Sequence, residues 1–85
     1  MIEITEIRLT KTNGEDKQLA YGSITFANAF VVNGIRVIKA ASGEKYIAYP
    51  CRRNQNGEYK DICYPKTKEL REEITLRVLA QYDEM

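Results

Sequence analysis

Histidine is absent from this sequence, and cysteine and proline occur only twice each. Histidine is the side chain that most often transfers protons in enzymes, and no glycine-rich phosphate loop or nucleophile motif takes its place. Two cysteines without a histidine do not complete a metal site. We therefore expect a protein that is not an enzyme, that needs no metal or other cofactor, and that has no small-molecule substrate.

Long apolar runs are missing too, because no stretch approaches the roughly 20 residues that a membrane helix requires. The first residues, MIEITEIRLT, alternate apolar and polar side chains and include acids, whereas a secretory signal has basic residues followed by a continuous apolar segment. Cys51 and Cys63 are too few for a disulfide framework. These features predict a cytoplasmic protein with no membrane partner and with reduced thiols.

Charge is distributed unevenly along the 85 residues, although the net charge is only +1. Residues 45–71 hold seven basic and three acidic side chains, whereas residues 72–85 hold one basic and four acidic side chains. A nearly neutral protein can therefore present a basic face. A chain of this length forms one domain, residues 1–85. Its core is small and its stability marginal, so we expect copies of the chain to associate.

The first half of the sequence has the alternation and the β-branched residues of antiparallel strands. In residues 1–11 the apolar parity switches near Thr5-Glu6, which predicts a β-bulge. A turn at 13–16 (NGED) and strands at 18–26, 29–40 and 45–49 follow. Within the third strand, Asn33-Gly34 favours a bend in one long strand, and the alternative is a hairpin between two shorter strands.

The end of the sequence changes to helical periodicity. Apolar residues three or four positions apart form one stripe, made of Leu70, Ile74, Val78, Leu79 and Tyr82. Thr67 is the predicted N-cap, and Pro65 marks the boundary before the helix. Strands followed by a single helix predict an α+β fold, a four- to five-stranded antiparallel sheet with a C-terminal helix, rather than a doubly wound fold.

Between sheet and helix lies YPCRRNQNGEYKDICYP, residues 49–65, which predicts a hairpin turning on Asn56-Gly57. A two-residue type I′ turn places Arg53 opposite Lys60. A loop with one more residue places Arg53 opposite Asp61 and brings the two cysteines face to face, the only register that permits a disulfide. The sequence leaves both registers open.

Arg52 and Arg53 are adjacent in this hairpin, and two interpretations apply to them. They are either solvated surface charges or part of a phosphate-binding patch, in which arginine forks make bidentate contacts. The second interpretation gains weight from three basic residues at the helix start, Lys66, Lys68 and Arg71. The helix start carries a partial positive charge, which disfavours these cations but favours a bound anion. Nearby tyrosines are either cross-strand partners or stacking platforms for unpaired bases.

Four segments, taken in order, resemble the SpoVG family of bacterial septation regulators: ITEIRLTK, FVVNGIRVIKAASGEKYIAYPCRR, NGEYKDICYP and LRVLAQYDEM. The resemblance implies a small cytoplasmic, dimeric protein with a β-rich body and a C-terminal helix, which binds DNA and also RNA and affects septation or sporulation. It assigns the family's basic pair to Arg52 and Arg53. The variable segment thought to influence sequence choice corresponds to Lys66, Thr67, Lys68 and Glu69.

The sequence departs from the family's pattern at two places. Cys51 stands where serine is usual, and Cys63-Tyr64 replace the more typical Ala-His. A role for that histidine does not carry over to this chain. The basic pair is intact, so the binding hypothesis stands.

Our hypothesis from the sequence is a homodimeric, non-enzymatic regulator that binds DNA, and RNA as well, through its phosphates. The candidate site consists of Arg52, Arg53, Lys60, Lys66, Thr67, Lys68 and Arg71. The alternative is a protein-interaction module of the division or sporulation machinery, which acts through a sheet edge or the acidic end of the helix.

Overall fold

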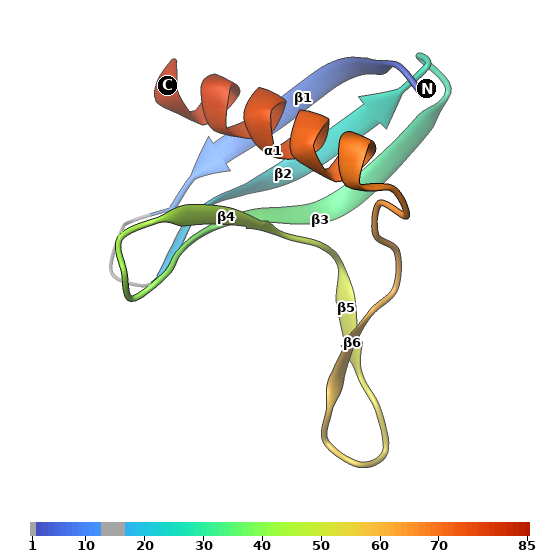
Figure 1. Ribbon diagram of the computed structural model, residues 1–85, viewed down its shortest axis with the longest axis vertical. Helices are drawn as coiled ribbons and strands as arrows, with labels where there is room; N and C mark the ends of the chain where they lie inside the picture. The colour runs from blue at the N-terminus through green and yellow to red at the C-terminus, as the bar shows by residue number, and fades with distance from the viewer. Residues whose placement is uncertain (1, 13–16) are drawn as a thin grey trace.

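A four-stranded antiparallel sheet forms the body of the protein in the computed structural model, which describes residues 2–12 and 17–85 (Figure 1). The strands lie in chain order, β1-β2-β3-β4. Their bounds are Ile4–Lys11, Gln18–Phe26, Phe30–Lys39 and Lys45–Ala48; the remaining elements are β5 (Cys51–Arg53), β6 (Tyr59–Asp61) and α1 (Lys68–Asp83). The predicted α+β fold is confirmed. The turn predicted at 13–16 lies outside the described residues.

The predicted bulge in β1 is present at Thr5. Ile4 pairs with Phe26, but the next pair is Glu6 with Thr25, so Thr5 is the additional residue. Its hydroxyl donates to the Thr25 carbonyl at 3.2 Å. The bulge corrects the parity of the strand, so that Ile4 is buried and the later apolar residues Ile7 and Leu9 pack against the same core.

Strand β3 runs without interruption through Asn33-Gly34, which confirms the long strand and excludes the hairpin alternative. Gly22 pairs with Ile35 and Ser23 with Asn33, so Gly34 is the extra residue of a second bulge. Its φ of 86° is in the left-handed region that glycine adopts readily.

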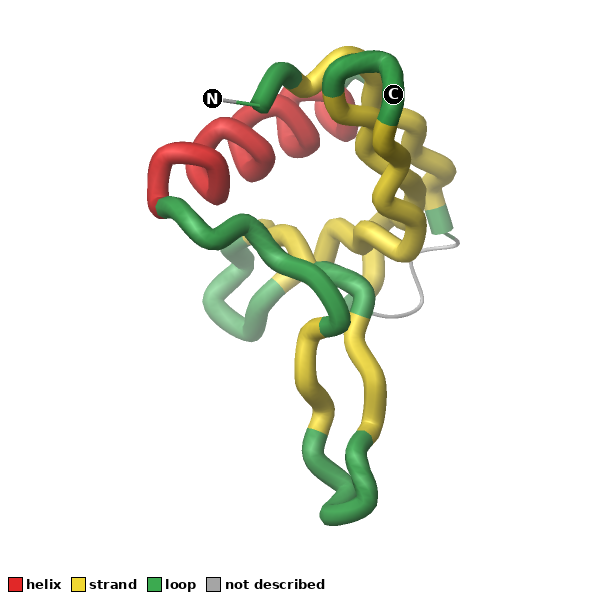
Figure 2. The backbone as a smooth tube through the Cα atoms, turned by 90° about the vertical axis from the view of Figure 1, so that its right-hand side faces the viewer, coloured by secondary structure: helices red, strands yellow, loops and turns green. Residues whose placement is uncertain are grey.

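Helix α1 crosses one face of the sheet and contacts β1 and β4 (Figures 1 and 2). Ile74 and Val78 of the predicted stripe are buried, and Leu70, Leu79 and Tyr82 pack around them. Opposite them lie the apolar residues of the sheet, among them Ile24, Ile35 and Val37, which are almost fully buried. The helix thus covers the apolar face of a sheet that could not bury it alone.

Thr67 caps the helix, as predicted. Its hydroxyl accepts a hydrogen bond from the backbone amide of Leu70 at 3.2 Å. At the other end, the ammonium group of Lys11 donates to the Met85 carbonyl at 3.1 Å and lies over the Tyr82 ring. The cap thus satisfies an amide at the helix start, and Lys11 of β1 holds the chain just beyond the helix end. Over residues 2–12 and 17–85, no helix combines the length and apolar character needed to cross a membrane.

Candidate nucleic-acid interface

The chain leaves the main sheet after β4 and forms a separate two-stranded hairpin from β5 and β6. We call residues 51–61 the arm. In Figures 1 and 2 the arm projects away from the sheet and the helix, and its tip is remote from both. The sheet of the body therefore has four strands, and the predicted fifth strand belongs to the arm. An isolated hairpin is only marginally stable in water, so the arm gains little from its own ladder.

The register of the arm differs from both predicted registers. Arg52 pairs with Lys60, Arg53 with Tyr59, and Cys51 with Asp61. The predicted pairings of Arg53 with Lys60 or with Asp61 are therefore wrong. An arginine still lies opposite Lys60, as predicted for the type I′ turn, but it is Arg52 rather than Arg53.

The loop explains this register. The amide of Gly57 donates to the Asn54 carbonyl at 3.1 Å, and the amide of Asn54 donates to the Glu58 carbonyl at 2.8 Å, so three residues lie between the closing pair. Gly57 has a φ of 84°, whereas Asn56 is not in the left-handed region. This is a type I turn followed by a glycine bulge, not the predicted type I′ turn. The Asn54 side chain selects it, since its Oδ1 accepts from the amides of Asn56 and Glu58, both at 2.9 Å.

The register separates the two arginines. Directly paired residues of a ladder share a face, so Arg52 and Lys60 lie on one face of the arm and Arg53 lies with Tyr59 on the other. An open hollow of ≈ 520 Å³ nevertheless borders both arginines and Lys60. The arm thus carries positive charge on both faces around one hollow.

The pairing of Arg52 with Lys60 disfavours the arm, because like charges directly opposed across a ladder repel. In the part of the chain that the structure describes, ion pairs join Glu6 to Arg8 and Lys68 to Glu72, and none involves the arm. A second like-charged pair, Lys39 with Lys45, occurs in the main sheet. There the other strands and the helix support the ladder; the arm lacks such support.

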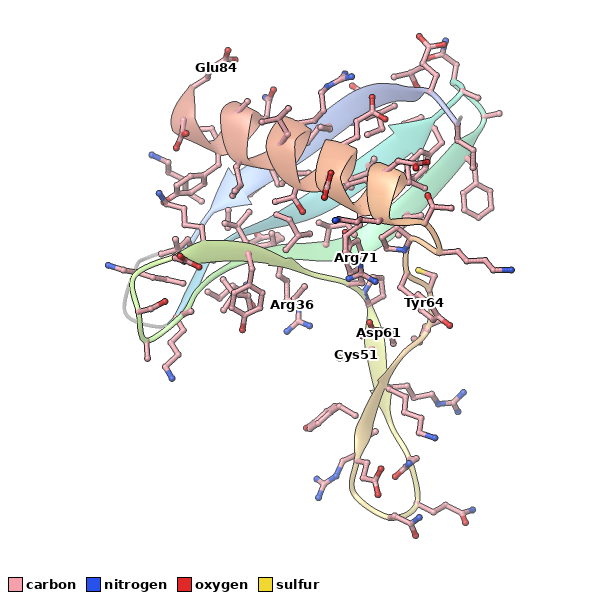
Figure 3. The ribbon with its side chains drawn as sticks, viewed as in Figure 1. Arg36, Cys51, Asp61, Tyr64, Arg71 and Glu84 are labelled. Carbon is pink, nitrogen blue, oxygen red and sulfur yellow. The ribbon has the colours of Figure 1, made fainter. Side chains whose placement is uncertain are left out.

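The residues at the helix start form a second group, joined to the arm by residues 62–65. Lys66 and Lys68 are exposed, and the ammonium group of Lys68 lies 3.8 Å from Glu72. Thr67 is engaged as the helix cap. Arg71 donates to the Pro65 carbonyl at 3.4 Å, and its guanidinium lies 6.0 Å from the centre of the Tyr49 ring. Figure 3 shows Arg71 reaching from α1 toward the base of the arm, so it holds the junction of arm and body.

Tyr49 packs at this junction and is only 7% exposed. Its hydroxyl is buried without a hydrogen-bond partner among the described residues. Burial raises the pKa of the phenol above 10.0; the charge of Arg71 opposes this shift and that of Asp61 adds to it. Tyr49 therefore contributes to the junction through its ring rather than through its hydroxyl.

The two cysteines are free thiols. Cys51 pairs with Asp61, and the Ile62 amide bonds to the Pro50 carbonyl at 2.7 Å, so Cys63 lies beyond the position opposite Cys51. The register that would permit a disulfide is therefore not the observed one. No group of three or more cysteine and carboxylate side chains within residues 2–12 and 17–85 is placed to hold a metal ion.

Sequence reasoning missed two features of the arm. Gln55 and Asn56 occupy its tip with exposed side chains, because the turn is centred on them rather than on Asn56-Gly57. Tyr59 is 70% exposed beside Arg53. The asparagine that begins the loop, Asn54, was the available signal for this turn.

These elements define a small α+β domain from which a hairpin projects, and its three basic side chains form no ion pair with any described residue. The SpoVG family model matches residues 2–84, and the chain belongs to the SpoVG family.

Curated relatives agree with this assignment over nearly the full chain. A protein of Heliobacterium modesticaldum named "Putative septation protein SpoVG" is 43% identical over 81 residues, which cover 95% of this chain and 90% of the relative. Relatives of the same name from Clostridium perfringens and Archaeoglobus fulgidus are 40% and 38% identical over 84 residues, or 99% of this chain and 92% and 98% of theirs. The similarity therefore includes the arm as well as the body.

Proposed function

We propose that this protein is a non-enzymatic, nucleic-acid-binding regulator of the septation or sporulation type, which holds DNA, and RNA as well, by the phosphates through its arm. The cellular role follows from the names of its relatives, which are called septation proteins. The contact residues are Arg52, Arg53 and Lys60, with Lys66 and Lys68 as a second group.

The observation that carries this proposal is the pairing of Arg52 with Lys60 in a hairpin that receives no support from the main sheet. Two like charges held side by side, with no ion pair to either of them among the described residues, disfavour the arm in water, but they favour an anion between them. A feature that conflicts with local stability is typical of functional sites. A phosphate would remove the repulsion and order the arm.

The arm also contains two acids, which limit its affinity. Glu58 follows the loop, and Asp61 pairs with Cys51. With a few phosphate contacts per subunit, binding is expected to be modest and strongly dependent on salt. A second copy of the arm in a dimer would double the contacts.

The N-terminal half of β3 is the edge that we propose for this dimer. Strand β4 pairs only with Arg36–Lys39, so residues 30–34 have no strand on that side within the described ranges. Phe30 and Val31 are 66% and 51% exposed there. The edge of β1 is a poorer candidate, because a bulge and the charged side chains Glu6 and Arg8 protect it.

Sedimentation or light scattering tests the dimer. Val31→Lys is expected to shift the protein to the monomer, since it places a charge on the proposed edge. Tyr46→Lys is a matched control with a similarly exposed residue on β4, and it should leave the mass unchanged. If Val31→Lys is dimeric, the edge assignment is wrong. A monomeric native protein would refute the dimer itself.

Fluorescence anisotropy over a series of salt concentrations tests nucleic-acid binding. Random pools of duplex DNA, single-stranded DNA and RNA serve as probes. The native protein should bind with a log–log salt slope of about −0.9 for each duplex phosphate that it neutralises. Replacing both Arg52 and Arg53 with alanine should remove most of the affinity and flatten the slope.

The matched control replaces Lys39 and Lys45 of the main sheet with alanine, which removes the same amount of charge from a place outside the proposed site. This control should bind almost as tightly as the native protein. Circular dichroism verifies that each variant is folded. Equal losses in both double variants would mean that net charge alone governs binding, and full binding by the arginine variant would refute the role of the arm.

A further inference from the structure

The three loop residues at the tip of the arm are polar and uncharged, and the charged residues nearest to them are Arg53 and Glu58. The loop contains Gln55, Asn56 and Gly57, and Asn54 precedes them. The basic side chains Arg52 and Lys60 lie further back along the strands. The arm thus ends in side chains suited to neutral hydrogen bonding, behind which lie side chains suited to phosphate.

Hydrogen bonds from the backbone hold the loop in one shape and leave two side-chain carboxamides exposed. The side chain of Asn54 is engaged with the amides of Asn56 and Glu58, and this holds the turn. Gln55 and Asn56 are exposed, and within the described ranges their side chains make no hydrogen bond. The turn therefore has a defined backbone shape, and the carboxamides of Gln55 and Asn56 are free to bond to a partner.

We propose that the arm enters the major groove of B-form DNA and that the carboxamides of Gln55 and Asn56 read the edges of adenine bases. The inference rests on the proposed function, to which it adds the substrate class and the groove. Carboxamides match adenine because they accept from N6 and donate to N7 together.

The dimensions of the arm fit this groove. The major groove is about 12 Å wide and about 8.5 Å deep, and it admits a two-stranded ribbon. Gln55 lies three residue steps beyond Arg52, which is about 10 Å at roughly 3.3 Å per step. This length is close to the depth of the groove. Arg52 and its partner Lys60 therefore lie at the level of the phosphates when the carboxamides of Gln55 and Asn56 touch the base edges at the floor of the groove.

The two faces of the arm then meet the two walls of the groove. Arg52 and Lys60 face one phosphate backbone, and Arg53 faces the other. The guanidinium of Arg53 lies beside Gly57, so this charge is nearer the tip. Opposite faces carrying basic groups would serve a flat surface poorly, but they suit a groove with phosphates on both sides.

The minor groove and A-form RNA duplexes fit less well. The minor groove is only about 6 Å wide, and proteins that widen it use apolar wedge residues. Residues 54–57, Asn-Gln-Asn-Gly, contain no such wedge. The major groove of duplex RNA is too narrow for side chains to read. The arm therefore selects B-form DNA among duplexes.

Anisotropy titrations with three duplexes of one A·T-rich sequence test the proposal. The first is unmodified DNA, the second carries 7-deazaadenine, which lacks the N7 acceptor but keeps every phosphate, and the third is the RNA duplex. We expect the native protein to bind 7-deaza DNA about tenfold more weakly than unmodified DNA, the size of one bidentate base contact. Duplex RNA should bind no better than 7-deaza DNA.

Two variants complete the experiment. With Gln55 and Asn56 both replaced by alanine, the affinity for unmodified DNA should fall to that for 7-deaza DNA, while the salt slope stays unchanged. Lys66→Ala, at the helix start, should lower affinity for all three duplexes alike and keep the tenfold ratio. If the ratio instead vanishes in Lys66→Ala, the helix start reads the sequence and the proposal is overturned.

The result also separates this inference from the proposed function. Salt-dependent binding with equal affinity for unmodified and 7-deaza DNA would overturn readout in the major groove and leave phosphate binding intact. Displacement by netropsin, a minor-groove ligand, would overturn it in the same way. Absence of salt-dependent binding to every probe would overturn the proposed function itself, and the groove assignment with it.

Discussion

Replacing Lys60 with glutamate should stabilise the arm and weaken nucleic-acid binding at the same time. In the native arm Lys60 lies directly opposite Arg52 in the ladder. The substitution converts repulsion between the paired side chains into attraction. It also removes one proposed phosphate contact and places a negative charge in its position.

The sizes of both effects follow from the register. Cross-strand charge pairs contribute about 0.2–1 kcal/mol, favourable for opposite charges and unfavourable for like charges. A gain near 1 kcal/mol lowers the open fraction of the arm about fivefold. On the binding side, each lost phosphate contact lowers the magnitude of the log–log salt slope by about 0.9.

Amide hydrogen exchange, resolved by residue, measures the first effect, and anisotropy titrations against salt measure the second. Exchange is best followed at low ionic strength, because salt screens exposed charges. Lys60→Gln is the control: it removes the repulsion without adding attraction, so its gain in protection should be about half. Faster exchange in Lys60→Glu, or unchanged binding, would refute the reasoning about this pair.

Three further predictions concern the body. Tyr49→Phe should not destabilise the protein, since the Tyr49 hydroxyl is buried without a partner among the described residues. Burial raises the Tyr49 pKa above 10.0, so the unfolded chain loses its phenol proton first and the stability of the native protein falls as the pH rises past that value. Urea unfolding should show a smaller fall in the variant. Gly22→Ala should destabilise by several kcal/mol in thermal unfolding, because a Cβ there would collide with the Arg8 carbonyl oxygen. Thr67→Ala should cost about 1 kcal/mol by the same measurement, since the cap on the Leu70 amide is lost.

Local patterns in the sequence were sufficient for the body of the fold. The parity switch predicted the bulge at Thr5, and the continuous β-branched run around Asn33-Gly34 predicted one long strand. The apolar stripe predicted which side of α1 is buried. These features depend on periodicity, which neighbouring residues along the chain determine.

The candidate site was predictable only in part. Arg52, Arg53 and Lys60 do lie in one hairpin, but their pairing depends on a one-residue difference in loop length. Asn54 decides that difference through hydrogen bonds of its side chain, which alternation along the strands does not reveal. Arg71 bonds to the Pro65 carbonyl, a tertiary engagement that helical periodicity does not reveal, and its role as a contact stays a prediction.

The sequence by itself determined the order of the elements, the apolar faces that pack together and the family of the chain, because side-chain periodicity and the succession of motifs are local properties. Only the tertiary structure decided that β5 and β6 leave the sheet as a separate arm and which face each arginine occupies. The first outcome depends on where the chain leaves β3, at Pro50, which lies beside Gly34. The second depends on how the three-residue loop of the arm closes. Both depend on contacts that form only when the chain folds, and periodicity along the sequence does not encode them.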